Sequence, residues 1–145
     1  LVDVTKWISK KKDLCGLPIA FFGASTGAGA AIRAANTLKN SGLVYAIVSR
    51  GGRPDLAGNA LKEINIPTLL LVGENDLDIV ELNKAAQNSM NQCEISIVRG
   101  ASHLFEEPGA LKEVSKQAAE WFENHLPIKK SKHSFKIQEG LSYSK

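Results

Sequence analysis

The sequence predicts an α/β domain built on an open parallel sheet of about four strands, with helices on both faces. Four short apolar runs recur along the chain, at residues 17–23, 43–48, 68–73 and 94–98. Stretches with helical spacing of apolar residues separate these runs. The runs are continuous rather than alternating, and Gly and Pro bound them, as expected for strands buried on both faces. This order favours right-handed parallel crossovers, which place the strands side by side in sequence order.

Helical spacing is clearest at the two ends of the predicted domain. Leu1, Val4, Trp7 and Ile8 recur at helical spacing before the first strand. A final helix is predicted over residues 108–126, with Pro in its first turn. Its apolar stripe is formed by Leu111, Val114, Ala118, Phe122 and Leu126, with Trp121 beside it. No strand follows this helix, so it should cover the sheet face opposite to the other helices.

Charge divides the 145 residues into a near-neutral part and a basic end. Of the 18 Lys and Arg and 15 Asp and Glu, five Lys and one Glu lie in residues 127–145. We therefore expect one folded domain at residues 1–126 and a flexible basic tail at residues 127–145, which includes Lys129, Lys130 and Lys132. The near-neutral domain gives no support for binding to nucleic acid or to a membrane surface.

Metal, cofactor and membrane signals are weak throughout the sequence. Cys15 and Cys93 show neither metal-ligand spacing nor a disulfide framework, and we expect both to be reduced and partly buried. No metal or cofactor is expected. No run of 18 apolar residues occurs, and no signal peptide opens the chain at Leu1, so the expected location is the cytoplasm.

A candidate nucleophile follows the first predicted strand. Residues 23–27 read Gly-Ala-Ser-Thr-Gly, a G-x-S-x-G pattern with a helix after it. In such an elbow the serine, here Ser25, sits in a strained turn, and small residues two positions away on either side relieve crowding. The next amide, that of Thr26, lies at a helix N-terminus, where it can stabilise an oxyanion.

This glycine-rich turn has two other interpretations. It can be a plain connection between strand and helix, or a phosphate-binding loop. A Walker motif needs Lys after its last Gly, where this chain has Ala28, and the glycines are out of register for G-x-G-x-x-G. The strand before the turn and the helix after it therefore favour the nucleophile.

A candidate acid and a candidate base follow the third and fourth strands. Asp76 ends the segment GEND, and His103 ends RGASH. Functional residues of open parallel sheets gather in the loops beyond the carboxyl ends of the strands, so Ser25, Asp76 and His103 can face one crevice. An imidazole can take the hydroxyl proton while a carboxylate fixes its tautomer. Glu74 and Asp78 remain alternatives for the acid, with helix capping or solvation as the structural explanation.

Arg50 and Arg53 are candidate substrate-binding residues. They lie in the loop after the second strand, at the same edge as the candidate nucleophile, and can contact an anionic group. The structural alternative pairs Arg53 with Asp55, and Arg50 with Glu74.

Four segments of the sequence carry a family resemblance: GASTGAGAA, VSRGGRPDL, PTLLLVGEND, and GASHLFEEPGAL with EWFENHL. Together they resemble the dienelactone-hydrolase-like branch of the α/β-hydrolases, of the type found fused to or encoded with phosphoribosyltransferases. The resemblance covers residues 1–126. It implies hydrolysis of a small soluble ester or similar acyl bond through an acyl-enzyme, with Ser25, Asp76 and His103 as the catalytic triad.

The resemblance also has two departures. True dienelactone hydrolases use a cysteine nucleophile where this chain has Ser25, so a dienelactone substrate does not follow. The α/β-hydrolase fold has about eight strands with the nucleophile after the fifth, so the chain is expected to be the C-terminal half of such a fold, with the N-terminal half as its missing partner. A phosphoribosyltransferase domain is an expected neighbour in the full-length protein. The alternative function is a non-catalytic binding module or an inactive fragment.

Overall fold

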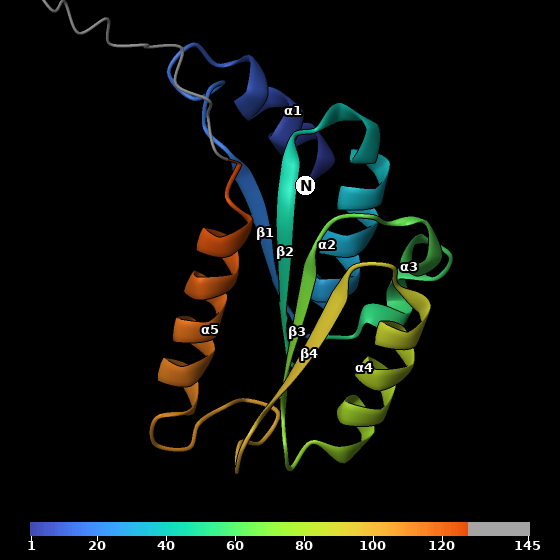
Figure 1. Cartoon of the computed structure of the whole chain (residues 1–145), viewed down its shortest axis with the longest axis vertical. Helices are drawn as coiled ribbons and strands as arrows, with labels where there is room; N and C mark the ends of the chain where they lie inside the picture. The colour runs from blue at the N-terminus through green and yellow to red at the C-terminus, as the bar shows by residue number, and fades with distance from the viewer. Residues whose placement is uncertain (128–145) are drawn as a thin grey trace, which may run out of the picture.

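The computed structural model describes residues 1–127, which form one four-stranded sheet with helices on both faces (Figure 1). All three strand pairs are parallel and the order is β1-β2-β3-β4, as the sequence predicts. The strands are β1 (Ile19–Ala24), β2 (Val44–Arg50), β3 (Thr68–Gly73) and β4 (Cys93–Val98). The predicted basic tail falls outside the described residues, apart from Pro127.

Helices connect the strands in the expected alternation. The α-helices are α1 (Val2–Lys10), α2 (Thr26–Thr37), α3 (Ala60–Glu63), α4 (Leu77–Ser89) and α5 (Ala110–His125). Two 3-10 helices, η1 (Lys39–Ser41) and η2 (Pro54–Ala57), complete the described chain. Between β2 and β3 the connection holds only η2 and the four-residue α3, so no large insertion covers the carboxyl edge of the sheet there.

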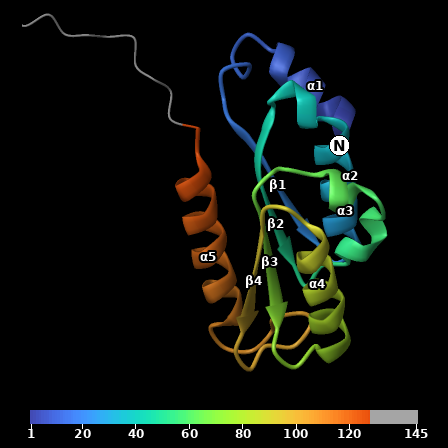
Figure 2. The ribbon, with the colours of Figure 1, turned by 45° about the vertical axis from the view of Figure 1, so that its right-hand side comes forward.

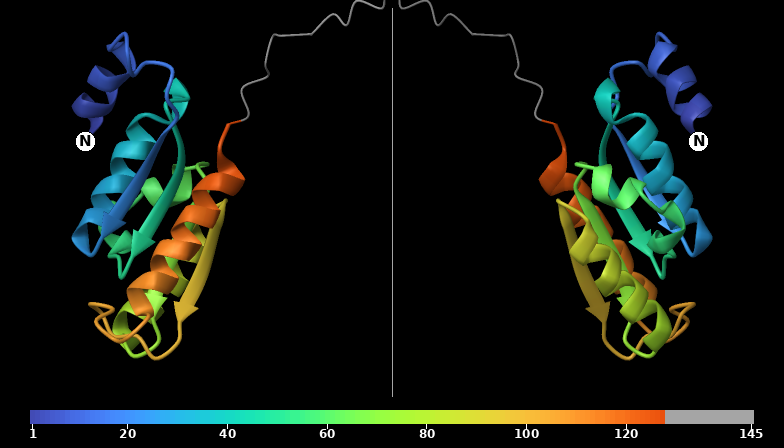
Figure 3. Two further views of the ribbon diagram at one scale, coloured as in Figure 1. Left: turned by 90° about the vertical axis from the view of Figure 1, so that its left-hand side faces the viewer. Right: turned by 90° about the vertical axis from the view of Figure 1, so that its right-hand side faces the viewer.

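The two faces of the sheet carry different helices, as Figures 2 and 3 show. On one face α2, α3 and α4 pack over a core that includes Ile32, Ile47 and Leu70. On the other face α5 packs alone, over a core that includes Val48 and Leu71. The predicted position of the last helix is therefore confirmed. Strand residues alternate between these cores, because successive side chains of a strand point to opposite faces.

The last helix differs in detail from its prediction. It begins at Ala110 rather than at Pro108, because Gly109 adopts a left-handed conformation, with φ of 85°, just before the first helical turn. Its buried face is formed by Ala110, Val114, Ala118 and Trp121. Leu111 and Leu126, which the predicted stripe included, are about half exposed. The stripe is thus rotated, and Trp121 faces the core instead of flanking it.

Apolar side chains of the first helix and first strand also remain exposed. Val4 and Trp7 are each 56% exposed although their spacing predicts a buried face, and Thr5 is the buried residue of α1. Phe22, on β1 at the edge of the sheet, is 51% exposed. Helical spacing therefore gives the correct element for α1 but the wrong buried face.

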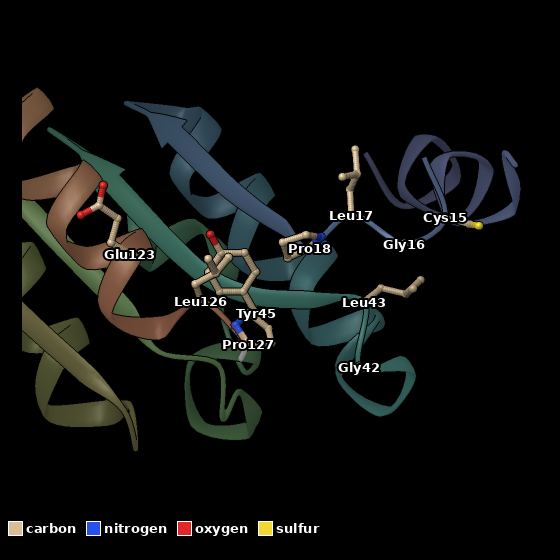
Figure 4. Close-up of a pocket in the computed structure, with 10 residues that line it drawn as sticks. All are labelled: Cys15, Gly16, Leu17, Pro18, Gly42, Leu43, Tyr45, Glu123, Leu126 and Pro127. Atoms are coloured by element: carbon tan, nitrogen blue, oxygen red, sulfur yellow. The ribbon is translucent and has the colours of Figure 1, made fainter. Parts of the chain in front are cut away.

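A pocket opens at the amino ends of β1 and β2, between the start of the sheet and the end of α5 (Figure 4). Its volume is about 650 Å³. The residues that line it are mainly apolar or small: Cys15, Gly16, Leu17, Pro18, Gly42, Leu43, Tyr45, Glu123, Leu126 and Pro127. The candidate catalytic residues lie beyond the opposite, carboxyl ends of the strands, so this pocket is separate from them.

Truncation of a buried strand residue tests this core. Leu70 is fully buried beneath α2 and α4, and Leu70→Ala should lower the free energy of unfolding by about 2–5 kcal/mol because it leaves a cavity. Leu111→Ala is the matched control, since Leu111 is 48% exposed. Urea denaturation measures both variants. Equal losses for the two would contradict the described packing.

Candidate active site

Ser25 lies in a strained turn between β1 and α2. Its backbone has φ of 50° and ψ of −125°, a combination that residues other than glycine rarely adopt. Three backbone hydrogen bonds hold it there: its amide donates to the Arg50 carbonyl at 3.2 Å, and its carbonyl accepts from Ala28 at 3.2 Å and from Arg53 at 3.0 Å. This turn has the backbone geometry expected of a nucleophile elbow.

The predicted relief of crowding holds at one of the two glycines. A Cβ at Gly23 would lie 2.6 Å from the Cα of Ala28, so only glycine lets the strand and helix approach this closely. A Cβ at Gly27 would meet nothing within 4 Å, so that part of the prediction is wrong. Thr26 is the first residue of α2, and its amide therefore has no carbonyl partner within the helix.

Asp76 and His103 meet in the loops after β3 and β4. The carboxylate oxygen Oδ2 of Asp76 lies 2.6 Å from Nδ1 of His103. An ionised carboxylate can only accept, so Nδ1 carries the proton and Nε2 is left as the basic nitrogen. The Asp76 side chain is 16% exposed and that of His103 is 41% exposed. The pair thus combines a sheltered carboxylate with an accessible imidazole.

The two alternative acids have other positions. Glu74 accepts a hydrogen bond from the amide of Gly100 at 2.7 Å. Asp78 is an exposed residue in the first turn of α4. Asp76 precedes that helix but its side chain makes no capping hydrogen bond, so helix capping does not explain it. Of the three candidate acids, Asp76 is therefore the one whose carboxylate pairs with His103.

The loop after β2 contacts both the Ser25 turn and the His103 ring. The Ser25 amide binds the carbonyl of Arg50, the residue before Gly51. The His103 ring lies over Gly51, since a Cβ there would be 3.6 Å from Nδ1. Within residues 1–127 no hydrogen bond joins the Ser25 hydroxyl to His103. The loop after β2 therefore links the Ser25 turn to the His103 loop, but the Ser25 hydroxyl and the His103 imidazole are not hydrogen-bonded to each other.

The two arginines of this loop differ in their surroundings. Arg53 forms a two-pronged ion pair with Asp55, at 2.8 and 2.7 Å, as its structural alternative supposed. This hydrogen-bonded pairing lowers the pKa of the Asp55 carboxyl. Arg50 does not pair with Glu74; its guanidinium lies 5.7 Å from the ring centroid of Phe105. Arg50 forms no ion pair with any carboxylate in residues 1–127.

Two polar side chains near the site were not singled out from the sequence. Glu107 accepts a hydrogen bond from the Ser102 amide at 3.0 Å, and hydrogen bonds from Ser102 lower the pKa of this carboxyl. Buried Asn83 donates to the carbonyl of Gly52 at 2.9 Å. A polar residue on the otherwise apolar face of α4 was an available signal for Asn83. Glu107 had none, because its partner is a backbone amide.

Within residues 1–127, the two cysteines and His125 lie away from the Asp76–His103 pair: Cys15 precedes β1, Cys93 begins β4, and His125 ends α5. Both cysteines are free; Cys15 is exposed, contrary to the expected partial burial, and Cys93 is partly buried. Burial raises the pKa of the Cys93 thiol to about 12, which keeps it protonated and unreactive at neutral pH. His125 points its Nδ1 at the carbonyl of Trp121 on the opposite face. His133 lies outside the described residues.

Residues 1–127 contain no group of three or more His, Cys, Asp and Glu side chains that could hold a metal ion. None of the helices in this part of the chain is both long and apolar enough to cross a membrane.

The parallel sheet, with Ser25, Asp76 and His103 following β1, β3 and β4 in that chain order, has the arrangement expected of the α/β-hydrolase class. A crystal structure of dienelactone hydrolase from Anabaena variabilis is 46% identical, with a TM-score of 0.83 over 87% of this chain and 58% of that one. An α/β serine hydrolase homologue from Coxiella burnetii, 24% identical, shares the fold with a TM-score of 0.66 over 81% of this chain and 54% of that one. The chain therefore shares the α/β-hydrolase fold, and over 58% of the Anabaena chain it resembles the dienelactone-hydrolase-like branch.

Curated proteins add a second kind of relative. Two Mycobacterium tuberculosis proteins, from different strains, are each 51% identical over 127 residues and carry the provisional name phosphoribosyl transferase. The matched region is 87% of this chain but 28% of theirs. No protein-family model matches the chain. The chain thus spans little more than a quarter of these curated relatives.

The backbone strain at Ser25 can be measured through glycine substitution. A residue held in such a conformation costs about 1–3 kcal/mol, so Ser25→Gly should raise the free energy of unfolding by about 1 kcal/mol, even after the entropic cost of glycine. Ser25→Ala is the control, since it removes the hydroxyl but keeps the Cβ. Urea denaturation compares the two variants. A Ser25→Gly protein no more stable than Ser25→Ala would show that the elbow is unstrained.

Proposed function

We propose that this chain carries the catalytic residues of a serine hydrolase that cleaves a small soluble ester or similar acyl bond. The observation that carries the proposal is the 2.6 Å contact between Asp76 and His103, at the same edge of the sheet as the strained turn of Ser25. In this contact the carboxylate fixes the imidazole tautomer, which leaves Nε2 free to act as a base. The connection between β2 and β3 holds only the short helices η2 and α3, so no large insertion covers this edge of the sheet. This favours a small substrate.

The proposed reaction has two halves. In the first, the Ser25 hydroxyl oxygen bonds to the acyl carbon while Nε2 of His103 takes its proton, and the alcohol leaves with that proton. In the second, His103 takes a proton from water, the resulting hydroxide bonds to the acyl carbon, and the acid leaves as the proton returns to Ser25. The Thr26 amide, unpaired at the start of α2, donates to the oxyanion in both halves. An acyltransferase would use the same residues with an alcohol in place of water.

The difference between the two arginines suggests which one meets a substrate. The charge of Arg53 is already neutralised by Asp55. Arg50 leaves the end of β2 next to Ser25 and has no ion pair within the described residues. Arg50 is therefore the better candidate for contact with an anionic group on the substrate, such as a carboxylate.

The rival function is a hydrolase-like module that binds a partner without turnover. The lack of a hydrogen bond between Ser25 and His103 is the observation that favours it. The names of the mycobacterial relatives support the further proposal that a phosphoribosyltransferase domain accompanies the chain in the full-length protein. Kinetic tests on that full-length protein separate the two functions, since only the enzyme turns over esters.

Replacement of the acid provides the direct kinetic test. Asp76→Asn should lower kcat for p-nitrophenyl acetate by about 10⁴-fold, because the amide favours the wrong imidazole tautomer. Asp78→Asn, a change of the same type two residues along the chain, should leave kcat within a factor of two or so. Steady-state kinetics of the full-length protein measures both. Equal rates for the two variants, or no turnover by the parent protein, would favour the binding module.

Arg50 is tested by substrate charge. Arg50→Met keeps an unbranched apolar side chain next to Phe105 but removes the cation, so it should raise KM for an ester that bears a carboxylate by about tenfold, the equivalent of 1.4 kcal/mol. The KM for a neutral ester of the same size should not change. A parallel rise for both esters would indicate that Arg50 shapes the site without binding an anion.

A further inference from the structure

The loop that carries His103 is anchored at its ends and open in the middle. It leaves β4 through Gly100, which has φ of 70°, and ends at Phe105, which has φ of 59°. The Phe105 side chain is 1% exposed and belongs to the core beneath α5. The His103 side chain is 41% exposed, so packing alone does not hold its ring. The position of the imidazole therefore depends on what holds the loop backbone.

Two side chains next to Asp76 hold both backbone polar groups of Gly100. Glu74 accepts from the Gly100 amide through Oε2 at 2.7 Å. Asn75 donates from Nδ2 to the Gly100 carbonyl at 2.9 Å. The backbone of the same two residues adds bonds to Val98 at 3.0 Å and to Ala101 at 2.9 Å. We call Glu74, Asn75 and Gly100 the loop clamp. It ties the loop of the acid directly to the loop of the base.

The clamp acts on two loops that already touch. A Cβ at Gly73 would lie 2.5 Å from the carbonyl oxygens of both Ala101 and Ser102. At this distance the loops cannot move closer, but packing does not stop them from sliding or separating. Directional hydrogen bonds resist both movements, because the strength of a hydrogen bond falls steeply when its distance and angle change. The clamp supplies two such bonds within two residues of Asp76.

The residue types suit this role better than a role in stability. Glu74 and Asn75 are exposed, so they bury little apolar surface. The Glu74 carboxylate accepts from the Gly100 amide, and the Asn75 side-chain amide donates to the Gly100 carbonyl. Each residue type therefore matches the backbone group that it binds. Hydrogen bonds at such exposed positions contribute little net stability. Their geometric effect on Asp76 and His103 remains, because it needs no large energy.

We propose that Glu74 and Asn75 are positioning residues, which set the His103 imidazole at hydrogen-bond distance from Asp76 through the loop clamp. The proposal rests on the proposed function in that His103 is the base of the reaction. Neither residue touches the substrate in this proposal. Loss of the clamp should therefore lower kcat and leave KM unchanged, because it displaces the base without altering substrate contacts.

The experiment uses full-length protein and three variants at the clamp. Glu74→Ala removes the acceptor, Glu74→Gln keeps an acceptor oxygen at the same place, and Asn75→Asp sets a carboxylate against the Gly100 carbonyl. Glu81→Ala is the matched control, because it removes an exposed carboxylate whose 2.9 Å ion pair with Lys84 lies on the surface of α4. Two readouts are taken: kcat and KM for p-nitrophenyl acetate, and the low-field proton resonance of His103 Nδ1–H, which reports the bond to Asp76 without catalysis.

The expected result is a loss of kcat of roughly 10- to 100-fold in Glu74→Ala and Asn75→Asp at unchanged KM, with loss of the Nδ1–H resonance. Glu74→Gln and Glu81→Ala should keep both readouts. Parent-like kcat and resonance in Glu74→Ala and Asn75→Asp would overturn the proposal. If the parent protein turns over no ester, the proposed function fails; the resonance alone then decides whether the clamp positions His103. Asn75→Asp preserves side-chain size, so it remains informative if Glu74→Ala does not fold.

Discussion

The hydrogen bond between Asp76 and His103 joins the loops of two neighbouring strands, and it depends on the parallel register of β3 and β4. Gly73 pairs with Val98 at the end of this register, so both loops leave the sheet at the same level. Ala24 pairs with Arg50 in the same way, which brings the Ser25 turn to that edge. An antiparallel neighbour would send one of these loops to the opposite edge. The parallel crossovers are thus the condition for any chemistry at this site.

Local strain and close approach then determine which residues can occupy that edge. The backbone of Ser25 is held by three hydrogen bonds to its neighbours, and α2 buries Ala28 and Ile32 behind it. A rigid support of this kind offsets the cost of a conformation that the residue would not adopt by itself. Close approach also restricts the residue type at position 73. Only glycine, which has no side chain, lets the loop of His103 lie against the end of β3.

Most of the fold could be predicted because its signals are local. Continuous apolar runs and helical spacing located all four strands and the side of the sheet that α5 covers. The elbow could be predicted from the G-x-S-x-G pattern at residues 23–27, and the Asp76–His103 contact from chain order and from the rule that loops at carboxyl ends converge. The exposed face of α1 and the buried face of α5 could not be predicted in this way, because the spacing of apolar residues identifies a helix but not the elements that cover it. Glu107 and the loop clamp were also missed, since their partners are backbone groups that no sequence pattern reveals.

Covalent labelling tests most directly whether Ser25 is a nucleophile with His103 as its base. Full-length protein is treated with a fluorophosphonate probe, digested, and mapped by mass spectrometry. We expect the probe on Ser25, and on neither Ser49 nor Ser102, because Ser25 is the one of these three serines that lies on the elbow. Labelling should disappear in Ser25→Ala. Labelling that survives this substitution, or a parent protein that never reacts, would contradict the account.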